Sequence, residues 1–167
     1  MTRSHFCILF VWISFTVLAF SYFVSERLVS FDSHHKLDNI AYQELSNYLA
    51  PYLINNNKTE QTILHFTQKE CTCQQYSEQH IQDINKIATD HGFNIKNIIV
   101  DDDTFIPSTP SVALLDHSGQ VIYFGPYGQG VGCSQTSGYA KTMLNNYLKG
   151  YSANIIIKEA KGCYCAV

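Results

Sequence analysis

The chain opens with a long apolar segment, and its remaining apolar residues alternate between patterns of helix and strand length. Residues 6–24 contain no charged side chain and follow Arg3. About 20 apolar residues are needed to cross the hydrocarbon core of a membrane. The pattern therefore predicts a transmembrane anchor at 6–24, with residues 1–5 in the cytoplasm. A cleaved signal peptide is the alternative, because the small residues Ala19 and Ser21 have the spacing of a cleavage site.

A polar linker at 25–36 leads into the predicted folded domain at 37–167. Near-continuous apolar runs there indicate strands covered on both faces, and apolar residues at i, i+3 and i+4 indicate helices. A strand, a helix and a second strand predict a right-handed βαβ unit, and a hairpin with a further helix completes an α/β fold. The predicted elements are a helix at 37–53, a strand at 62–67, a helix at 71–91, strands at 94–100, 111–116 and 120–124, a helix at 139–148 and a strand at 153–158.

Three glycines fall at the predicted ends and turns of these elements. Gly92 and Gly150 follow the predicted helices as C-terminal caps. Gly119 lies in the tight turn between the two hairpin strands, where it takes the left-handed backbone conformation. These positions support the predicted element boundaries.

Charge and cysteine content narrow the possible functions. The net charge of −3 gives no reason to expect nucleic acid as a partner. Six cysteines are more than a protein in a reducing cytosol needs for packing. The cysteine content therefore favours thiol chemistry outside the cytoplasm.

The predicted topology brings distant cysteines together. Cys71 and Cys73 open the 71–91 helix, where unpaired N–H groups and the helix dipole favour the thiolate form. The hairpin starts at this pole and returns to it, so the loop that ends in Cys133 is expected nearby. The last helix leaves this pole and the last strand covers a similar length back. We therefore expect Cys163 and Cys165 at the same pole.

Three local features are shared with a known superfamily. Phe66 stands five residues before Cys71, Thr109-Pro110 precedes a predicted strand, and residues 109–121 have the pattern of a hairpin. In these features residues 37–150 resemble the thioredoxin-like superfamily, in particular membrane-anchored periplasmic proteins of the TlpA type. The resemblance implies a thioredoxin-like three-layer α/β sandwich (βαβ plus ββα) and a cis peptide bond at Pro110 beside the reactive sulfur.

The chain departs from the family pattern around its cysteines. The family's CxxC would require a second cysteine where Gln74 stands, and Cys73 is one residue early. His65 occupies the position of a buried acid, and Glu70 replaces a tryptophan with a charge that opposes thiolate formation. The resemblance therefore supports the thioredoxin-like fold more strongly than the thioredoxin-like activity.

The favoured interpretation is a membrane-tethered, extracytoplasmic thiol–disulfide oxidoreductase or isomerase that needs no cofactor. Cys71 acts as nucleophile next to Thr109 and Pro110. The resolving thiol is Cys73, Cys133, or one of the pair Cys163 and Cys165. His65 tunes a thiol or is a packed core histidine. The expected partners are a protein thiol or disulfide and the inner membrane, crossed once with the domain in the periplasm.

Two other functions stay open on the residues alone. A thiolate site for Zn²⁺ or Cu(I) uses Cys71, Cys73, Cys163 and Cys165. Alternatively, disulfides to the C-terminal tail only pin the chain, and the domain is a non-enzymatic binding module.

Overall fold

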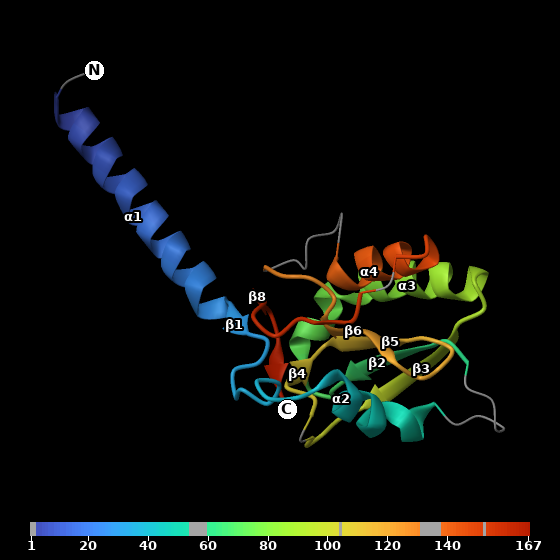
Figure 1. Cartoon of the computed structure of the whole chain (residues 1–167). Helices are drawn as coiled ribbons and strands as arrows, with labels where there is room; N and C mark the ends of the chain where they lie inside the picture. Colours follow the sequence, from blue (N-terminus) through green and yellow to red (C-terminus); the bar gives the residue numbers. More distant parts are fainter. Residues whose placement is uncertain (1–2, 54–59, 104, 131–137, 152) are drawn as a thin grey trace.

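The computed structural model describes residues 3–53, 60–103, 105–130, 138–151 and 153–167. Helix α1 (Arg3–Arg27) projects away from the rest of the chain (Figure 1). Its segment Ser4–Val24 is long and apolar enough to cross a membrane, and none of that segment is buried against the domain. The predicted apolar helix is therefore present, and a signal sequence would have the same appearance.

A mixed sheet of five strands forms the centre of the domain (Figure 1). The strand order is β3-β2-β5-β6-β7, with β2 parallel to β3, β6 parallel to β7, and antiparallel pairing elsewhere. The strands are β2 (Thr62–Thr67), β3 (Asn94–Ile99), β5 (Ser111–Leu115), β6 (Val121–Pro126) and β7 (Ile155–Ile156). Helix α3 (Glu78–Asp90) joins the parallel strands β2 and β3, which confirms the predicted βαβ unit.

Helices cover both faces of the sheet, which gives three layers (Figure 1). Helix α2 (Tyr42–Leu49) and the short 3₁₀ helix η1 (Ala50–Tyr52) lie on one face. Helices α3 and α4 (Tyr139–Leu148) lie on the other. Alternate residues of β2 therefore enter two different cores. One core contains Leu64 and Phe66 with Leu45 and Leu49, and the other contains Ile63 with Ile84 and Leu144.

The predicted hairpin and its glycine are confirmed. Strands β5 and β6 pair antiparallel, and Gly119 in their turn has φ 79°. The Asp116 carboxylate accepts hydrogen bonds from the Ser118 and Gln120 amides. Gly92, with φ 75°, follows α3 as predicted.

Two predicted helices and one strand have different bounds. The helix expected at 37–53 begins at Tyr42, because the Asp32 carboxylate accepts the Lys36 and Leu37 amides and holds the preceding segment in turns. The helix expected at 71–91 divides into the 3₁₀ helix η2 (Thr72–Tyr76) and α3. The strand expected at 153–158 is reduced to β7.

The C-terminal tail, residues 158–167, returns across one end of the domain and forms two short sheets. Strand β8 (Lys161–Gly162) pairs antiparallel with β1 (Val29–Ser30). Strand β9 (Cys165–Ala166) pairs antiparallel with β4 (Ser108–Thr109). The tail therefore joins the segment after α1 to the segment before β5.

Candidate functional site

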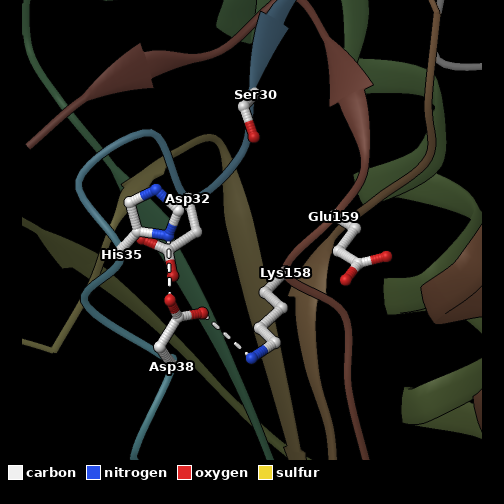
Figure 2. A pocket seen from close by; sticks show the side chains of 6 residues that line it. All are labelled: Ser30, Asp32, His35, Asp38, Lys158 and Glu159. Atoms are coloured by element: carbon white, nitrogen blue, oxygen red, sulfur yellow. Dashed lines mark hydrogen bonds and ion pairs between the residues drawn. The ribbon is translucent and has the colours of Figure 1, made fainter.

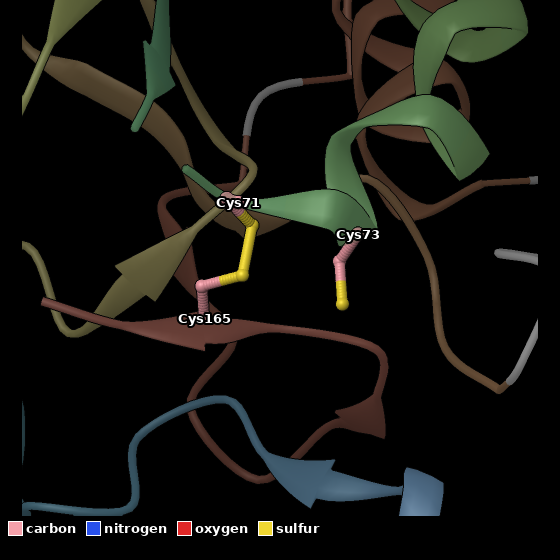
Figure 3. A group of neighbouring side chains, drawn as sticks. All are labelled: Cys71, Cys73 and Cys165. Carbon is pink, nitrogen blue, oxygen red and sulfur yellow. A yellow bond between two sulfur atoms is a disulfide. The ribbon is translucent and has the colours of Figure 1, made fainter. Parts of the chain in front are cut away.

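Four cysteines meet where the tail crosses the start of η2. Cys71 is bonded to Cys165 and Cys73 to Cys163, with Cα–Cα distances of 5.8 and 5.4 Å. The sulfur atoms of Cys71, Cys73 and Cys165 all lie within 4.8 Å of one another (Figure 3). The predicted return of the tail cysteines to this pole is confirmed. Cys133 lies outside the described residues.

The end of β2 and a short turn position the first cysteine pair. The Cys71 amide donates to the Gln68 carbonyl, and the Gln74 amide donates to the Cys71 carbonyl. Cys71 is the N-cap of η2, and Cys73 lies inside this five-residue 3₁₀ helix. The expectation that these cysteines open an α-helix is wrong, because α3 begins only at Glu78. A full α-helix dipole is therefore not directed at their sulfurs.

The tail presents its two cysteines to the first pair and the tyrosine between them to the core. Cys163 and Cys165 both bond to the first pair, whereas Tyr164 enters the core that contains Phe31. The Tyr164 ring is buried and packs edge-on against Phe31, with centroids 5.3 Å apart. Its hydroxyl donates to the Gly128 carbonyl at 2.5 Å. Sequence reasoning missed this anchor, although the Cys-Tyr-Cys pattern was its signal.

Thr109 and Pro110 lie directly against the sulfur of Cys71. The Thr109-Pro110 bond is cis, as the resemblance implied, and the Thr109 carbonyl oxygen is 3.5 Å from Cys71 Sγ. The Oγ atoms of Thr109 and Ser111 are buried, and within the described part of the chain neither has a hydrogen-bond partner. These two residues flank Pro110 in the sequence.

His65 is part of the packed core. Its Nδ1 is 2.5 Å from the Tyr127 hydroxyl and its Nε2 is 2.8 Å from Asn85 Oδ1. Burial lowers the pKa of His65, and the hydrogen bond to Asn85 opposes this shift. Burial also raises the pKa of Tyr127, so its hydroxyl keeps its proton and donates to Nδ1. Both ring nitrogens are thus occupied, which favours the packed histidine over the thiol-tuning role.

The charge of Glu70 has little effect on the neighbouring cysteines. Glu70 is exposed, so water screens its charge from the neighbouring sulfurs. Cys7 is exposed on α1, far along the chain from the four paired cysteines, and is not bonded to another cysteine.

A polar pocket lies beside the start of the tail (Figure 2). The Asp38 carboxylate accepts hydrogen bonds from Lys158 Nζ at 3.0 Å and from His35 Nδ1 at 2.9 Å. The bond from Lys158 lowers the pKa of Asp38, and the same bond raises the pKa of Lys158. The ion pair between Asp38 and Lys158 therefore joins the 30–38 segment to the tail. It is lined by Ser30, Asp32, His35, Asp38, Lys158 and Glu159.

Fold and site together define a mixed α/β domain, closed by two disulfides, behind an apolar N-terminal helix. Residues 39–167 match the model of the family described as "Domain of unknown function (DUF6436)". The chain belongs to this family. No curated protein and no solved structure matches it.

Proposed function

We propose that this protein is a membrane-tethered, extracytoplasmic thiol–disulfide oxidoreductase or isomerase of the thioredoxin-like superfamily, with Cys71 as its nucleophile. The observation that carries the proposal is the cluster of sulfurs. Atoms from two separate disulfides lie within 4.8 Å of one another, close enough for exchange after a small side-chain movement. A protein partner that supplies a thiol or a disulfide completes the reaction.

Three features of the fold support the superfamily assignment. A β2-α3-β3 unit is followed by a β5-β6 hairpin and α4. The nucleophile follows β2, the Thr109-Pro110 bond is cis, and the Thr109 carbonyl oxygen lies 3.5 Å from the sulfur of Cys71. The order of elements and the position of the cysteine thus agree with the resemblance found in the sequence.

Chain entropy makes the two disulfides unequal in their contribution to stability. A crosslink between Cys71 and Cys165 spans 94 residues, and such a loop stabilises a fold by about 4.7 kcal/mol in the loop-entropy account. Once it exists, the bond between Cys73 and Cys163 closes a ring of only a few residues, worth roughly 2 kcal/mol in the same account. The second disulfide thus adds less than half as much stability as the first, so one pair can open in an exchange reaction while the other still holds the tail.

The proposed reaction starts from the reduced protein. The Cys71 thiolate attacks one sulfur of a partner protein's disulfide, and the second partner sulfur leaves with the electron pair and takes a proton from water. The Cys165 thiolate then attacks Cys71 Sγ in the mixed disulfide, which releases the first partner sulfur as a thiolate. The partner gains two electrons, and the bond between Cys71 and Cys165 is restored. The reverse sequence oxidises a partner dithiol.

The proposed location is the inner membrane, with α1 crossing it once and the domain in the periplasm. Disulfides persist in oxidising compartments, and Arg3 at the start of α1 favours a cytoplasmic N-terminus. A membrane-impermeant maleimide added to intact cells after reduction should label Cys71. Labelling only after lysis would exclude this orientation.

A second candidate function is metal binding by the same cysteines after reduction. The three clustered sulfurs of Cys71, Cys73 and Cys165 favour it, with Cys163 as the fourth ligand. Four thiolates suit Zn²⁺ or Cu(I). Anaerobic purification of the reduced full-length protein and metal analysis test this: one tightly held ion per chain supports a metal site.

Equilibration with glutathione buffers tests the redox proposal. The full-length protein in detergent should pass reversibly between disulfide and thiol forms, and reduced protein should react with a small aromatic disulfide. Cys71→Ser should remove most of this reactivity, whereas Cys7→Ser, on the exposed face of α1, should retain it. Disulfides that resist every glutathione buffer, with equal reactivity in both variants, would identify a structural staple.

A further inference from the structure

We propose that the tail strand β9 occupies a docking edge for partner proteins, and that this edge takes an extended partner segment in which an aromatic residue directly precedes the reacting cysteine. The inference rests on the proposed function and adds the substrate class and a self-blocking element. The tail is thus an internal copy of the partner segment.

The first observation is how the tail is bound to the site. Strand β9 pairs antiparallel with β4, in a register that sets Cys165 opposite Thr109. The same Cys165 is bonded to Cys71, whose sulfur lies 3.5 Å from the Thr109 carbonyl. Strand pairing and a disulfide therefore hold the tail at one point, as they would hold a foreign strand in a mixed disulfide.

The second observation is that β4 has a pairing edge available only when the tail leaves. Among the described strands, β4 pairs with β9 alone. One residue further, the Val167 amide donates to the Pro107 carbonyl at 3.1 Å. When the tail departs, the backbone groups of residues 107–109 lose these partners, and an incoming extended segment can satisfy them.

The third observation defines the residue before the cysteine. Tyr164 is 6 % exposed and enters the core that contains Phe31 and Phe124. A partner segment that replaces the tail in the same register leaves this space to its own residue at the position before cysteine. An aromatic side chain fills that space, whereas a small polar one leaves it empty. The docking edge therefore selects partner segments in which an aromatic residue is followed by cysteine.

The tail is held by contacts that reduction can loosen. Cys163 and Cys165 are partly exposed, whereas Cys71 and Cys73 are each 8 % exposed, so a reductant reaches the tail sulfurs first. After reduction the tail keeps the burial of Tyr164 and a bond from Lys36 Nζ to the Val167 carbonyl oxygen at 2.6 Å. Docking of the tail then becomes an equilibrium in which a partner segment competes.

The test uses the full-length chain in detergent with Cys71 as its one cysteine, the other five being replaced by serine. The probe is a peptide of residues 159–167 with Cys163 replaced by serine and with a thionitrobenzoate disulfide on Cys165. The Cys71 thiolate attacks the peptide sulfur, and thionitrobenzoate leaves with the electron pair and is measured by its absorbance. A second reagent, the symmetric thionitrobenzoate disulfide, reports the reactivity of Cys71 without any strand docking.

Adding Tyr164→Ala to this chain should speed the peptide reaction about fivefold or more relative to the small reagent, because the internal competitor is weakened. Tyr151→Ala, at an exposed tyrosine, should leave the ratio unchanged. Tyr164→Phe keeps the ring and removes the hydroxyl, which donates to Gly128, so a smaller acceleration is expected, and it covers the case in which Tyr164→Ala fails to fold. A peptide with serine in place of Tyr164 should react more slowly.

The outcomes separate the two proposals. Reaction with the small reagent, but equal peptide rates with and without the tail substitutions, overturns the docking edge and leaves the redox function standing. Equal rates for the aromatic and serine peptides overturn the selectivity. No reaction of Cys71 with either reagent overturns the redox function and this inference together.

Discussion

The ring of Tyr164 packs edge-on against the ring of Phe31, with an interplanar angle of 79°. Phe31 lies directly after β1, and Tyr164 separates the two tail cysteines, so this contact joins the segment after the apolar helix α1 to the disulfide site. The disulfide site is therefore completed by packing between residues that are more than a hundred positions apart in the sequence.

Gly162 leaves room for this contact. A Cβ at Gly162 would lie 2.7 Å from the Tyr164 hydroxyl oxygen and 2.8 Å from its Cζ. We expect Gly162→Ala to displace the ring, to lower the free energy of unfolding by about 1–3 kcal/mol, and to speed reduction of both disulfides by dithiothreitol severalfold. Lys161→Ala, at the exposed neighbour, is the control. Reduction rates equal to those of the control would contradict the role of the Tyr164 ring.

The two disulfides should be non-additive in stability. Replacing the cysteines of either pair by alanine leaves the other pair to close a loop of about the same length. Each paired variant should therefore lose roughly 2 kcal/mol, and removal of all four cysteines about three times as much. Denaturant unfolding of the three variants measures this. Losses that simply add would mean that each bond constrains a separate part of the chain.

The unpartnered hydroxyl of Thr109 should be dispensable for stability. A buried hydroxyl without a partner costs about 1–3 kcal/mol, so Thr109→Val should keep or raise the stability of the oxidised protein. The matched control is Thr62→Val, because Thr62 Oγ1 donates to the Glu60 carbonyl at 2.8 Å and its loss should cost about 1 kcal/mol. Thermal unfolding of both variants gives the comparison. A larger loss at Thr109 than at Thr62 would contradict the assignment.

His65 should make the fold sensitive to mild acid. Its folded-state pKa is lowered from 6.5, so the unfolded chain binds the proton more readily and stability falls as the pH drops below about 6.5. The slope should approach about 1.4 kcal/mol per pH unit and level off below the folded-state pKa. His65→Gln should flatten it, whereas His117→Gln, in the exposed hairpin turn, should not. Unfolding curves between pH 7 and pH 5 measure this, and parallel slopes for wild type and His65→Gln would refute it.

The order of elements could be predicted from the sequence because each depends on neighbouring residues. The apolar run at 62–67 and the turn at Asp116–Gly119 both act over a few positions, and both were predicted with nearly their observed bounds. The return of Cys163 and Cys165 to the pole of Cys71 also followed, since rise per residue and strand direction fix the distance that the chain can cover.

Two details depended on side-chain contacts that periodicity does not contain. The start of α2 was set by the Asp32 carboxylate, which holds Lys36 and Leu37 in turns. The pairing of Cys71 with Cys165, and not with Cys163, goes with the register of β9 on β4, which sets Cys165 opposite Thr109. Sequence periodicity contains neither kind of information, because the first requires a specific side-chain hydrogen bond to nearby amides and the second requires a partner from a distant segment.

The sequence by itself determined an apolar N-terminal helix, an α/β domain and the meeting of two Cys-x-Cys pairs, because local periodicity and chain length are enough for these. Only the tertiary structure decided which sulfurs bond and that β9 lies along β4, because the docking of Tyr164 on Phe31 fixes the register of the tail. That register brings Cys165 opposite Thr109, next to the sulfur of Cys71.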